Sequence, residues 1–282
     1  MPSSSLRHVL EEMSALVRAI RAHEAGARAG RSPKHLHEMR VAVRRLRAAR
    51  RTSRELFDPA GVDRLRDELD WLGGGLGRLR DLDVLYKYLR PRLAALEGSE
   101  HRAGQGVLRR LSADRARARA ALNEALDGPR YPGLLEQLET FLSHPPASAS
   151  DVSLPDVAAT EWKRLRKAVQ KLPGRPSADE LHAVRIKVKR ARYAAELARA
   201  TTGERGKRFI LQAKKLQDIL GDLQDAVVIE QYLNDAIDRT EPAQALGKDL
   251  VKRQRKRRKK ARAAFFEEWP KLKRRGQEAW IA

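Results

Sequence analysis

Apolar residues recur along this chain at intervals of three and four positions, the spacing that places them on one side of an α-helix. Nowhere do they alternate with polar residues for the length of a β-strand. Two examples of the helical spacing are Leu36, Met39, Val43, Leu46 and Leu181, Val184, Val188, Ala191. The pattern therefore predicts an all-α protein.

Clusters of glycine, proline and serine divide the chain into segments of helical length. In the first half, we predict helices over residues 6–26, 33–56, 62–78, 81–96 and 105–126. In the second half, we predict helices over residues 156–171, 178–200, 205–220, 223–238 and 243–267. The longest break, 143–151, is rich in serine, proline and alanine, and it predicts a boundary between two domains, residues 1–150 and 151–282.

The two halves resemble each other in sequence. Residues 37–47 align with residues 182–192 at an offset of 145, with histidine and the basic positions in register. Further on, Leu-Gly-Arg-Leu-Arg-Asp at 76–81 matches Leu-Gly-Asp-Leu-Gln-Asp at 220–225. Matches in the same order predict a duplicated helical unit, with about four main helices in each copy.

Basic residues form a row beside the apolar side of one helix in each half. The first basic row is His37, Arg40, Arg44, Arg47 and Arg51, and the second basic row is His182, Arg185, Lys189 and Arg192. A solvated helix usually carries its charges opposite the core, so rows in this position predict the lining of a groove. Because like charges one turn apart repel, we expect an anionic ligand to supply the missing counter-charge.

Two alternatives stay open at this point. A basic row can be an ordinary solvated face, although its repetition with a histidine at the same position favours a ligand. Each histidine can equally pack inside a helical bundle or contact the ligand.

Composition narrows the class of partner. The 282 residues include 59 Lys and Arg against 37 Asp and Glu, a formal net charge of +22, which makes a polyanion the first partner to consider. Only 5% of the residues are aromatic, and of these only Tyr193 adjoins a basic row, whereas readers of single-stranded nucleic acid usually interleave aromatic and basic residues. The chain contains no cysteine, which excludes disulfides, thiolate zinc sites, iron–sulfur clusters and cysteine nucleophiles.

The sequence does not indicate a membrane protein, a metal-binding protein or an enzyme. No segment approaches a membrane span and the N-terminus does not resemble a signal peptide, so we expect a cytoplasmic protein with no membrane partner. His35 and His37 are two positions apart and cannot share a metal ion on a helix, and no metal site or cofactor is predicted. No catalytic motif is present, which indicates a binding protein that acts alone and is not an enzyme.

The pattern His-x-x-Arg-Val/Ile-x-Val-Arg/Lys-Arg-x-Arg, followed later by Leu-Gly-x-x-x-Asp and present twice, resembles the CHAD family, the conserved histidine α-helical domain. The resemblance covers essentially the whole chain. It implies two pseudo-symmetric helical bundles around a central basic groove or pore, and binding of inorganic polyphosphate there. With Arg45 and Arg190 added by the family pattern, the candidate binding residues are His37, Arg40, Arg44, Arg45, Arg47, Arg51, His182, Arg185, Lys189, Arg190 and Arg192. The second copy of the Leu-Gly motif has Asp222 and Gln224 where the first has Arg78 and Arg80.

Three local features have two interpretations each. The run 251–260 contains eight basic residues and belongs to the last predicted helix, where it either lines the groove or forms a generally attractive outer face. The glycines at 73–75 indicate close helix packing or a weakened helix end. Asp81 and Asp83 could suggest a metal pair, but Asp81 is better suited to cap the helix predicted to begin there.

Other functions compete with polyphosphate binding. A nucleic-acid-binding or architectural protein could use the same positive charge. An enzyme acting on polyphosphate or another phosphorylated substrate could use His37 or His182 as a phosphoryl acceptor or general acid. Association with polyphosphate granules is a further partner interpretation that the resemblance leaves open.

Overall fold

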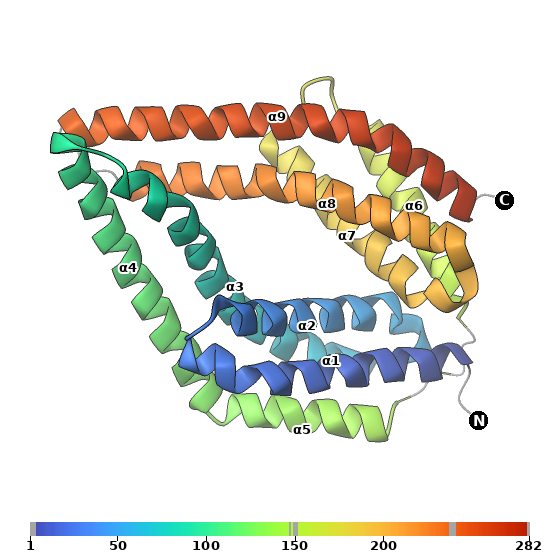
Figure 1. Cartoon of the computed structure of the whole chain (residues 1–282). Coiled ribbons are helices and arrows are strands. Elements are labelled where there is room, and N and C mark those ends of the chain that lie inside the picture. Colours follow the sequence, from blue (N-terminus) through green and yellow to red (C-terminus); the bar gives the residue numbers. More distant parts are fainter. Residues whose placement is uncertain (1–3, 147, 149–151, 237–240, 281–282) are drawn as a thin grey trace. The chain divides into compact units, whose positions relative to one another are not determined.

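The computed structural model describes residues 4–146, 148, 152–236 and 241–280. Over these ranges the regular structure consists of α-helices and one 3-10 turn, with no strand, so the all-α prediction is confirmed (Figure 1). The helices are α1 (Ser4–Ala29), α2 (Pro33–Thr52), α3 (Pro59–Ala94), α4 (Gly98–Asp127), α5 (Arg130–Ser143), α6 (Leu154–Gln170), α7 (Ala178–Leu197), α8 (Arg199–Ala236) and α9 (Glu241–Trp280). The 3-10 turn η1 (Arg54–Leu56) follows α2, so the helix predicted over 33–56 ends earlier than expected.

Several predicted helix ends are wrong because long helices continue through weak helix formers. The segments predicted as 62–78 and 81–96 are one helix, α3, so Asp81 lies inside a helix and is not an N-cap. The segments predicted as 205–220 and 223–238 belong to α8, in which only Gly203 departs from helical geometry, with φ 55° and ψ −143°. Pro270 lies inside α9, and α5 was not predicted at all. Tertiary packing stabilises these helices beyond what local propensity indicates.

The described residues form two compact units, each with its own core. Unit 1 consists of Met1–Asp81, Arg115–Ala158 and Tyr193–Thr201; unit 2 consists of Leu82–Asp114, Ala159–Arg192 and Thr202–Ala282. This division follows spatial contacts and passes through α3, α4, α6, α7 and the first turn of α8. The domain boundary at residue 150, which was inferred from the break at 143–151, stays a prediction.

The predicted break at 143–151 is partly ordered where it is described. Pro146 O accepts a hydrogen bond from Asp58 N at 2.7 Å, and Ser148 N donates to Leu56 O at 3.0 Å. Residues 147 and 149–151 of this break lie outside the described residues, as do 237 and 238 at the end of one predicted helix. The described part of the break therefore lies against the segment that follows η1.

Unit 1 is built on α1 and α2, which lie side by side, with α5 next to α1 (Figure 1). The apolar sides of α1 and α2 are buried, with Val9, Met13, Ile20, Leu36, Met39 and Leu46 all fully enclosed. The Phe57 and Phe141 rings pack with their centroids 4.9 Å apart. This burial orients α2, and with it the first basic row.

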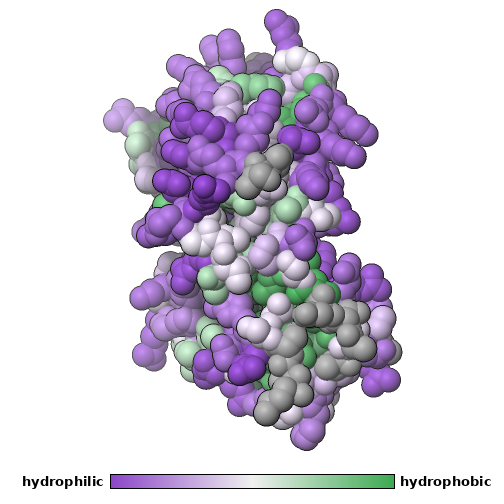
Figure 2. Space-filling view, turned by 90° about the vertical axis from the view of Figure 1, so that its right-hand side faces the viewer, coloured by the Kyte–Doolittle hydropathy of each residue, from purple (hydrophilic) through white to green (hydrophobic). Residues whose placement is uncertain are grey.

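Unit 2 contains α8 and α9, which run antiparallel along each other (Figure 1). Leucine, isoleucine and valine side chains from four helices form one part of its core: Leu85, Leu89, Leu93, Val107, Leu111, Ile229, Leu233, Leu246 and Leu250. Trp162 is fully buried, with the rings of Phe209 and Trp269 within 6 Å of its own. Hydrophilic side chains predominate on the face of the molecule shown in Figure 2, as the charged content of 34% leads us to expect.

Candidate functional site

The first basic row lies on α2, whose start is determined by a serine cap. Ser32 Oγ accepts a hydrogen bond from Lys34 N at 3.3 Å, and Pro33 occupies the first turn, where its missing N–H costs no hydrogen bond. The apolar residues Leu36, Met39, Val43 and Leu46 are buried, as their spacing predicts. His37, Arg40, Arg44 and Arg47 are half-buried and Arg51 is exposed. The row therefore lies along the edge of the buried side of α2.

Carboxylates from α3 accompany this row. Arg40 Nη2 lies 3.6 Å from Asp81 Oδ1, and Arg47 forms an ion pair with Asp70. The expectation that the row lacks counter-charge within the protein is wrong, because the partners come from a helix that is distant in sequence. Both carboxylates are about half exposed, and ion pairs of this kind are worth about 0–1 kcal/mol. An anionic ligand could therefore replace them at low cost.

Arg44 has a neutral partner. Its Nε donates a hydrogen bond to the hydroxyl of buried Tyr193, 2.9 Å away. Among the described residues, no carboxylate forms an ion pair with Arg44. The bond to Tyr193 holds the guanidinium in place and leaves its positive charge uncompensated.

The surroundings of His37 disfavour its protonation. Burial, followed by the charge of Arg80, lowers the pKa of His37 below its ordinary value; Arg44 and Arg40 act in the same direction, against Glu38. Its Nδ1 is buried and has no hydrogen-bond partner in the described part of the chain. Arg80 was not among the predicted site residues, although the Leu-Gly motif that contains it was recognised as part of the repeat.

Two glycines of α3 give the arginines of α2 room. A Cβ atom at Gly73 would lie 3.0 Å from Arg47 Nη1, and one at Gly77 would lie 3.8 Å from Arg40 Nε. Of the glycines at 73–75, Gly73 is closely packed, whereas Gly74 has no atom within 4 Å of a Cβ position. The alternative of a helix end is wrong because α3 continues past them.

The second basic row lies on α7, in unit 2. Ser177 and Glu180 form a capping box at the start of the helix: Glu180 N donates to Ser177 Oγ at 3.1 Å, and Ser177 N donates to Glu180 Oε2 at 2.7 Å. The apolar positions Leu181, Val184, Val188 and Ala191 are fully buried. His182, Arg185, Lys189, Arg190 and Arg192 are all half-buried. The arrangement on α2 is therefore repeated on α7.

Two glutamines of α8 bind side chains of this row. His182 Nδ1 donates to Gln224 Oε1 at 2.7 Å, since a carbonyl oxygen can only accept, and Arg192 Nε donates to Gln217 Oε1 at 3.1 Å. A Cβ atom at Gly221 would lie 4.0 Å from Arg185 Nη2, matching the relation between Gly77 and Arg40. In each unit the Leu-Gly motif thus lies against the histidine and arginines of the preceding motif.

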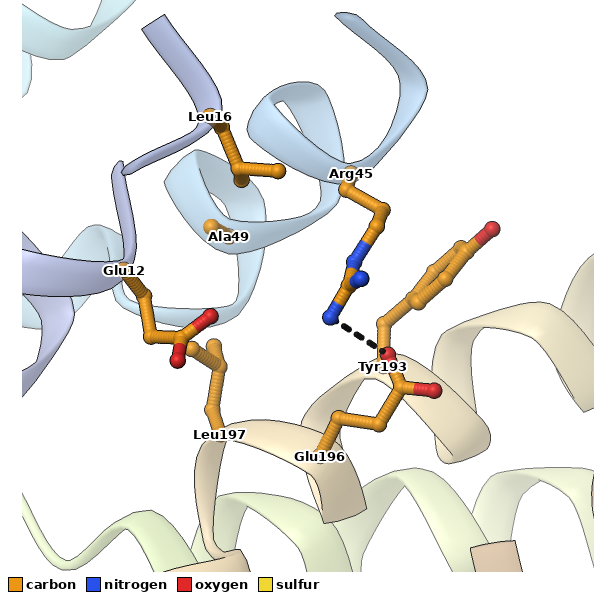
Figure 3. A pocket seen from close by; sticks show the side chains of 7 residues that line it. All are labelled: Glu12, Leu16, Arg45, Ala49, Tyr193, Glu196 and Leu197. Atoms are coloured by element: carbon orange, nitrogen blue, oxygen red, sulfur yellow. Dashed lines mark ion pairs between the residues drawn. The ribbon is translucent and has the colours of Figure 1, made fainter. Parts of the chain in front are cut away.

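Arg45 and Arg190 differ from the two rows. Arg190 Nε is buried without a hydrogen-bond partner among the described atoms. Arg45 lies 3.5 Å from Glu196 Oε2 and lines a small pocket of about 20 Å³, shown in Figure 3. The other lining residues are Glu12, Leu16, Ala49, Tyr193, Glu196 and Leu197. Two carboxylates in this pocket make it unfavourable for an anion, so the structure places Arg45 in a different environment from the rest of the predicted set.

The geometry agrees with a comparison to known families. The model of the CHAD domain matches residues 11–234 of this sequence, which include both basic rows and both Leu-Gly motifs. The chain belongs to the CHAD family. The resemblance inferred from the paired motifs is thereby confirmed.

Relatives in sequence and structure agree with this membership. Two proteins of Mycobacterium tuberculosis, "Uncharacterized protein MT2285" and "Uncharacterized protein Rv2226", are each 32% identical over 209 residues. The match covers 70% of this chain but 39% of each relative, so the chain spans well under half of their length.

Two solved structures share the fold of this CHAD chain. The crystal structure of the CHAD domain from the plant Ricinus communis has a TM-score of 0.76 and 25% identity, covering 93% of this chain and 90% of that chain. PptA from Streptomyces chartreusis has a TM-score of 0.75 and 24% identity, covering 93% of this chain and 96% of that chain. The helical architecture is therefore that of CHAD structures.

Membrane spans and metal sites are the remaining features to consider among the described residues. None of these helices is long and apolar enough to cross a membrane. No group of three or more histidine, aspartate or glutamate side chains within the described ranges is arranged to hold a metal ion.

Proposed function

We propose that this CHAD protein binds inorganic polyphosphate through the basic rows of α2 and α7. The observation that carries the proposal is the repetition of one arrangement in both units: a half-buried histidine and arginines or lysines on a helix, beside a glycine of the neighbouring helix. Membership of the CHAD family supports the same ligand, since the family resemblance implies polyphosphate.

The chemistry of the two rows suits a chain of phosphates. Guanidinium groups bind phosphate oxygens through paired hydrogen bonds, and lysine adds a mobile point charge. Arg44 offers a positioned charge without a carboxylate partner in the described part of the chain, and Arg40 and Arg47 can exchange half-exposed carboxylates for phosphates. The proposed residues are His37, Arg40, Arg44, Arg47 and Arg51 with His182, Arg185, Lys189, Arg190 and Arg192. Among the residues predicted from the sequence, Arg45 has the surroundings least favourable for a phosphate.

Binding without catalysis is part of this proposal. A histidine that accepts a phosphoryl group or transfers a proton is commonly oriented by a carboxylate. His182 Nδ1 instead donates to the amide of Gln224, and His37 Nδ1 has no described partner. The finer prediction that one polyphosphate chain lies in a basic groove between the two repeats rests on the family resemblance.

The experiment uses matched pairs of substitutions that each remove two positive charges. We expect Arg44→Gln with Arg47→Gln, and separately Lys189→Gln with Arg192→Gln, to weaken polyphosphate binding about tenfold or more, because phosphate contacts are lost. The control, Lys163→Gln with Lys214→Gln, neutralises two exposed lysines of α6 and α8. Binding is measured by calorimetry at physiological salt, and helical circular dichroism verifies the fold.

Equal losses in all three variants would contradict the proposal, because they would mean that net charge and not a site holds the ligand. Competition between long-chain polyphosphate and duplex DNA for the unmodified protein distinguishes the nucleic-acid alternative. If duplex DNA displaced polyphosphate from the two rows at equal phosphate concentration, polyphosphate would not be their preferred ligand.

A further inference from the structure

The arginines and lysines of the basic run of α9 differ in their partners within the protein. The arginines bind groups of the protein: Arg253 pairs with Asp249 at 2.8 Å, and Arg258 lies 3.0 Å from Glu230. Arg255 also pairs with Glu230, and Arg257 donates to Gln254 and lies over the Tyr88 ring. The contacts with Glu230 and Tyr88 join α9 to other helices of unit 2, and the carboxylates partly compensate the charge of Arg253, Arg255 and Arg258.

The lysines of the same helix face solvent. We call Lys248, Lys252, Lys256 and Lys259 the lysine row; all four are exposed, and within the described ranges none of them forms an ion pair. On a helix these positions fall within an arc of about 80° and extend over about 16 Å. The buried positions Leu250, Gln254 and Ala261 lie on the opposite side of α9. The lysine row is thus a straight, uncompensated line of positive charge on the outer face of one helix.

The lysine row is separate from the second basic row, because α8 lies between them. Gln217, Gly221 and Gln224 of α8 face α7, whereas Gln212, Lys215 and Glu230 of α8 contact α9. These two sets lie about 180° apart around the axis of α8. The lysine row points away from α8. One short stretch of phosphates therefore cannot contact the lysine row and also reach His182 or Arg192.

We propose that the lysine row is a docking surface for double-stranded nucleic acid, bound through its phosphates without reading the sequence. A duplex is rigid and carries about one negative charge per 1.7 Å of its length, so it can lie along a row of this length with little loss of conformational freedom. Free polyphosphate is flexible, and a convex face that touches it from one side only does not repay the cost of ordering it. Exposed lysines without accompanying asparagine or glutamine favour phosphate contacts over base contacts.

The test removes three charges from this face in the full chain. We expect Lys252→Gln with Lys256→Gln and Lys259→Gln to weaken binding of a mixed-sequence 24-base-pair DNA duplex about a hundredfold at 0.1 M salt. The slope of log affinity against log salt should fall in magnitude by about 2.7, because each lost phosphate contact removes about 0.9 from it. The matched control, Lys34→Gln with Lys163→Gln and Lys214→Gln, removes the same charge from exposed positions of α2, α6 and α8 and should change binding much less.

A second measurement tests the separation of the two surfaces. Saturating the unmodified protein with short-chain polyphosphate should leave duplex binding at the lysine row in place, and a duplex labelled with a fluorophore reports this directly. The proposal would be overturned if short-chain polyphosphate displaced the duplex. It would also be overturned if the control variant lost as much duplex affinity as the lysine variant, or if the lysine variant bound the duplex as tightly as the unmodified protein. Loss of binding to anionic phospholipid vesicles by the lysine variant, with duplex binding unchanged, would likewise overturn the proposal. If polyphosphate does not bind at all, the proposed function fails while the duplex measurements still decide the role of the lysine row.

Discussion

His37 and His182 occupy equivalent positions in the two repeats but have different surroundings. His37 faces Arg80 of the first Leu-Gly motif, and His182 donates to Gln224 at the equivalent place in the second. A cation next to an imidazole disfavours its protonation. The amide oxygen of Gln224 accepts a hydrogen bond and therefore faces a protonated Nδ1 of His182. The replacement of an arginine by a glutamine between the two Leu-Gly motifs therefore gives the two histidines different chemical surroundings.

At the scale of this residue, we predict that Arg80→Gln raises the pKa of His37, because the second largest cause of its lowering is removed. Adding polyphosphate to the unmodified protein should also raise it, since a polyanion favours the imidazolium. Binding then takes up a proton and strengthens as the pH falls toward the ordinary histidine range. Titration of the imidazole signal by NMR measures the pKa in each case.

Arg78→Gln is the control for this prediction, because Arg78 belongs to the same motif, is exposed, and is not among the causes of the shift. If Arg78→Gln changed the pKa as much as Arg80→Gln, the general positive charge of the protein would be responsible, and the local pairing of His37 with Arg80 would be refuted.

Among the helices, glycine has different roles at different positions. Gly74 lies inside α3 with no atom within 4 Å of the place that a Cβ would occupy. Gly276 lies in α9, where a Cβ would come within 2.4 Å of the indole of the buried Trp162. Gly74 therefore only weakens its helix, while Gly276 allows α9 to approach a tryptophan.

We predict that Gly74→Ala stabilises the protein by about 0.5–1 kcal/mol, because alanine is the better helix former and meets no neighbour. Gly276→Ala should destabilise it by about 1–3 kcal/mol, because the added methyl group overpacks the core around Trp162. Urea unfolding followed by circular dichroism measures both changes in the free energy of unfolding. A stabilising effect of Gly276→Ala would show that the packing of α9 on Trp162 is not as described.

For the whole molecule, positive charge exceeds what the protein can neutralise. The formal net charge is +22, and each of the two units carries one basic row on a helix of its own. Some arginines of the first row have carboxylate partners, but these ion pairs are half exposed and weak. The excess charge should therefore appear as a strong dependence of ligand binding on salt.

We predict that log affinity for polyphosphate falls linearly with log salt. If about 6–10 phosphates are neutralised and the duplex scale applies, affinity should fall by about 10³–10⁵ between 50 and 200 mM salt, because each contact releases a counterion. Calorimetry or fluorescence at a series of salt concentrations provides the measurement. A nearly flat dependence would exclude binding through several arginine and lysine contacts.

Local patterns in the sequence were sufficient for the helical class, the two basic rows and their relation to the buried sides of α2 and α7. The period of apolar residues reports which side of a helix is buried, and the positions of His37 and Arg40 next to Leu36 and Met39 follow from that period alone. The repeat likewise depends only on the order of residues, and it pointed to the family that the comparison confirmed.

Tertiary structure decided which residues meet, because partners distant in sequence leave no periodic signal. Asp70 and Asp81 reach Arg47 and Arg40 from α3, and this supplied the counter-charge that the sequence did not predict. The continuation of α3 and α8 through glycines was likewise decided by packing energy, which exceeds the small local cost of glycine in a helix. On α9, the sequence shows only a run of positive charge, and the contacts with Glu230 and Asp249 distinguish arginines that have carboxylate partners from the lysine row.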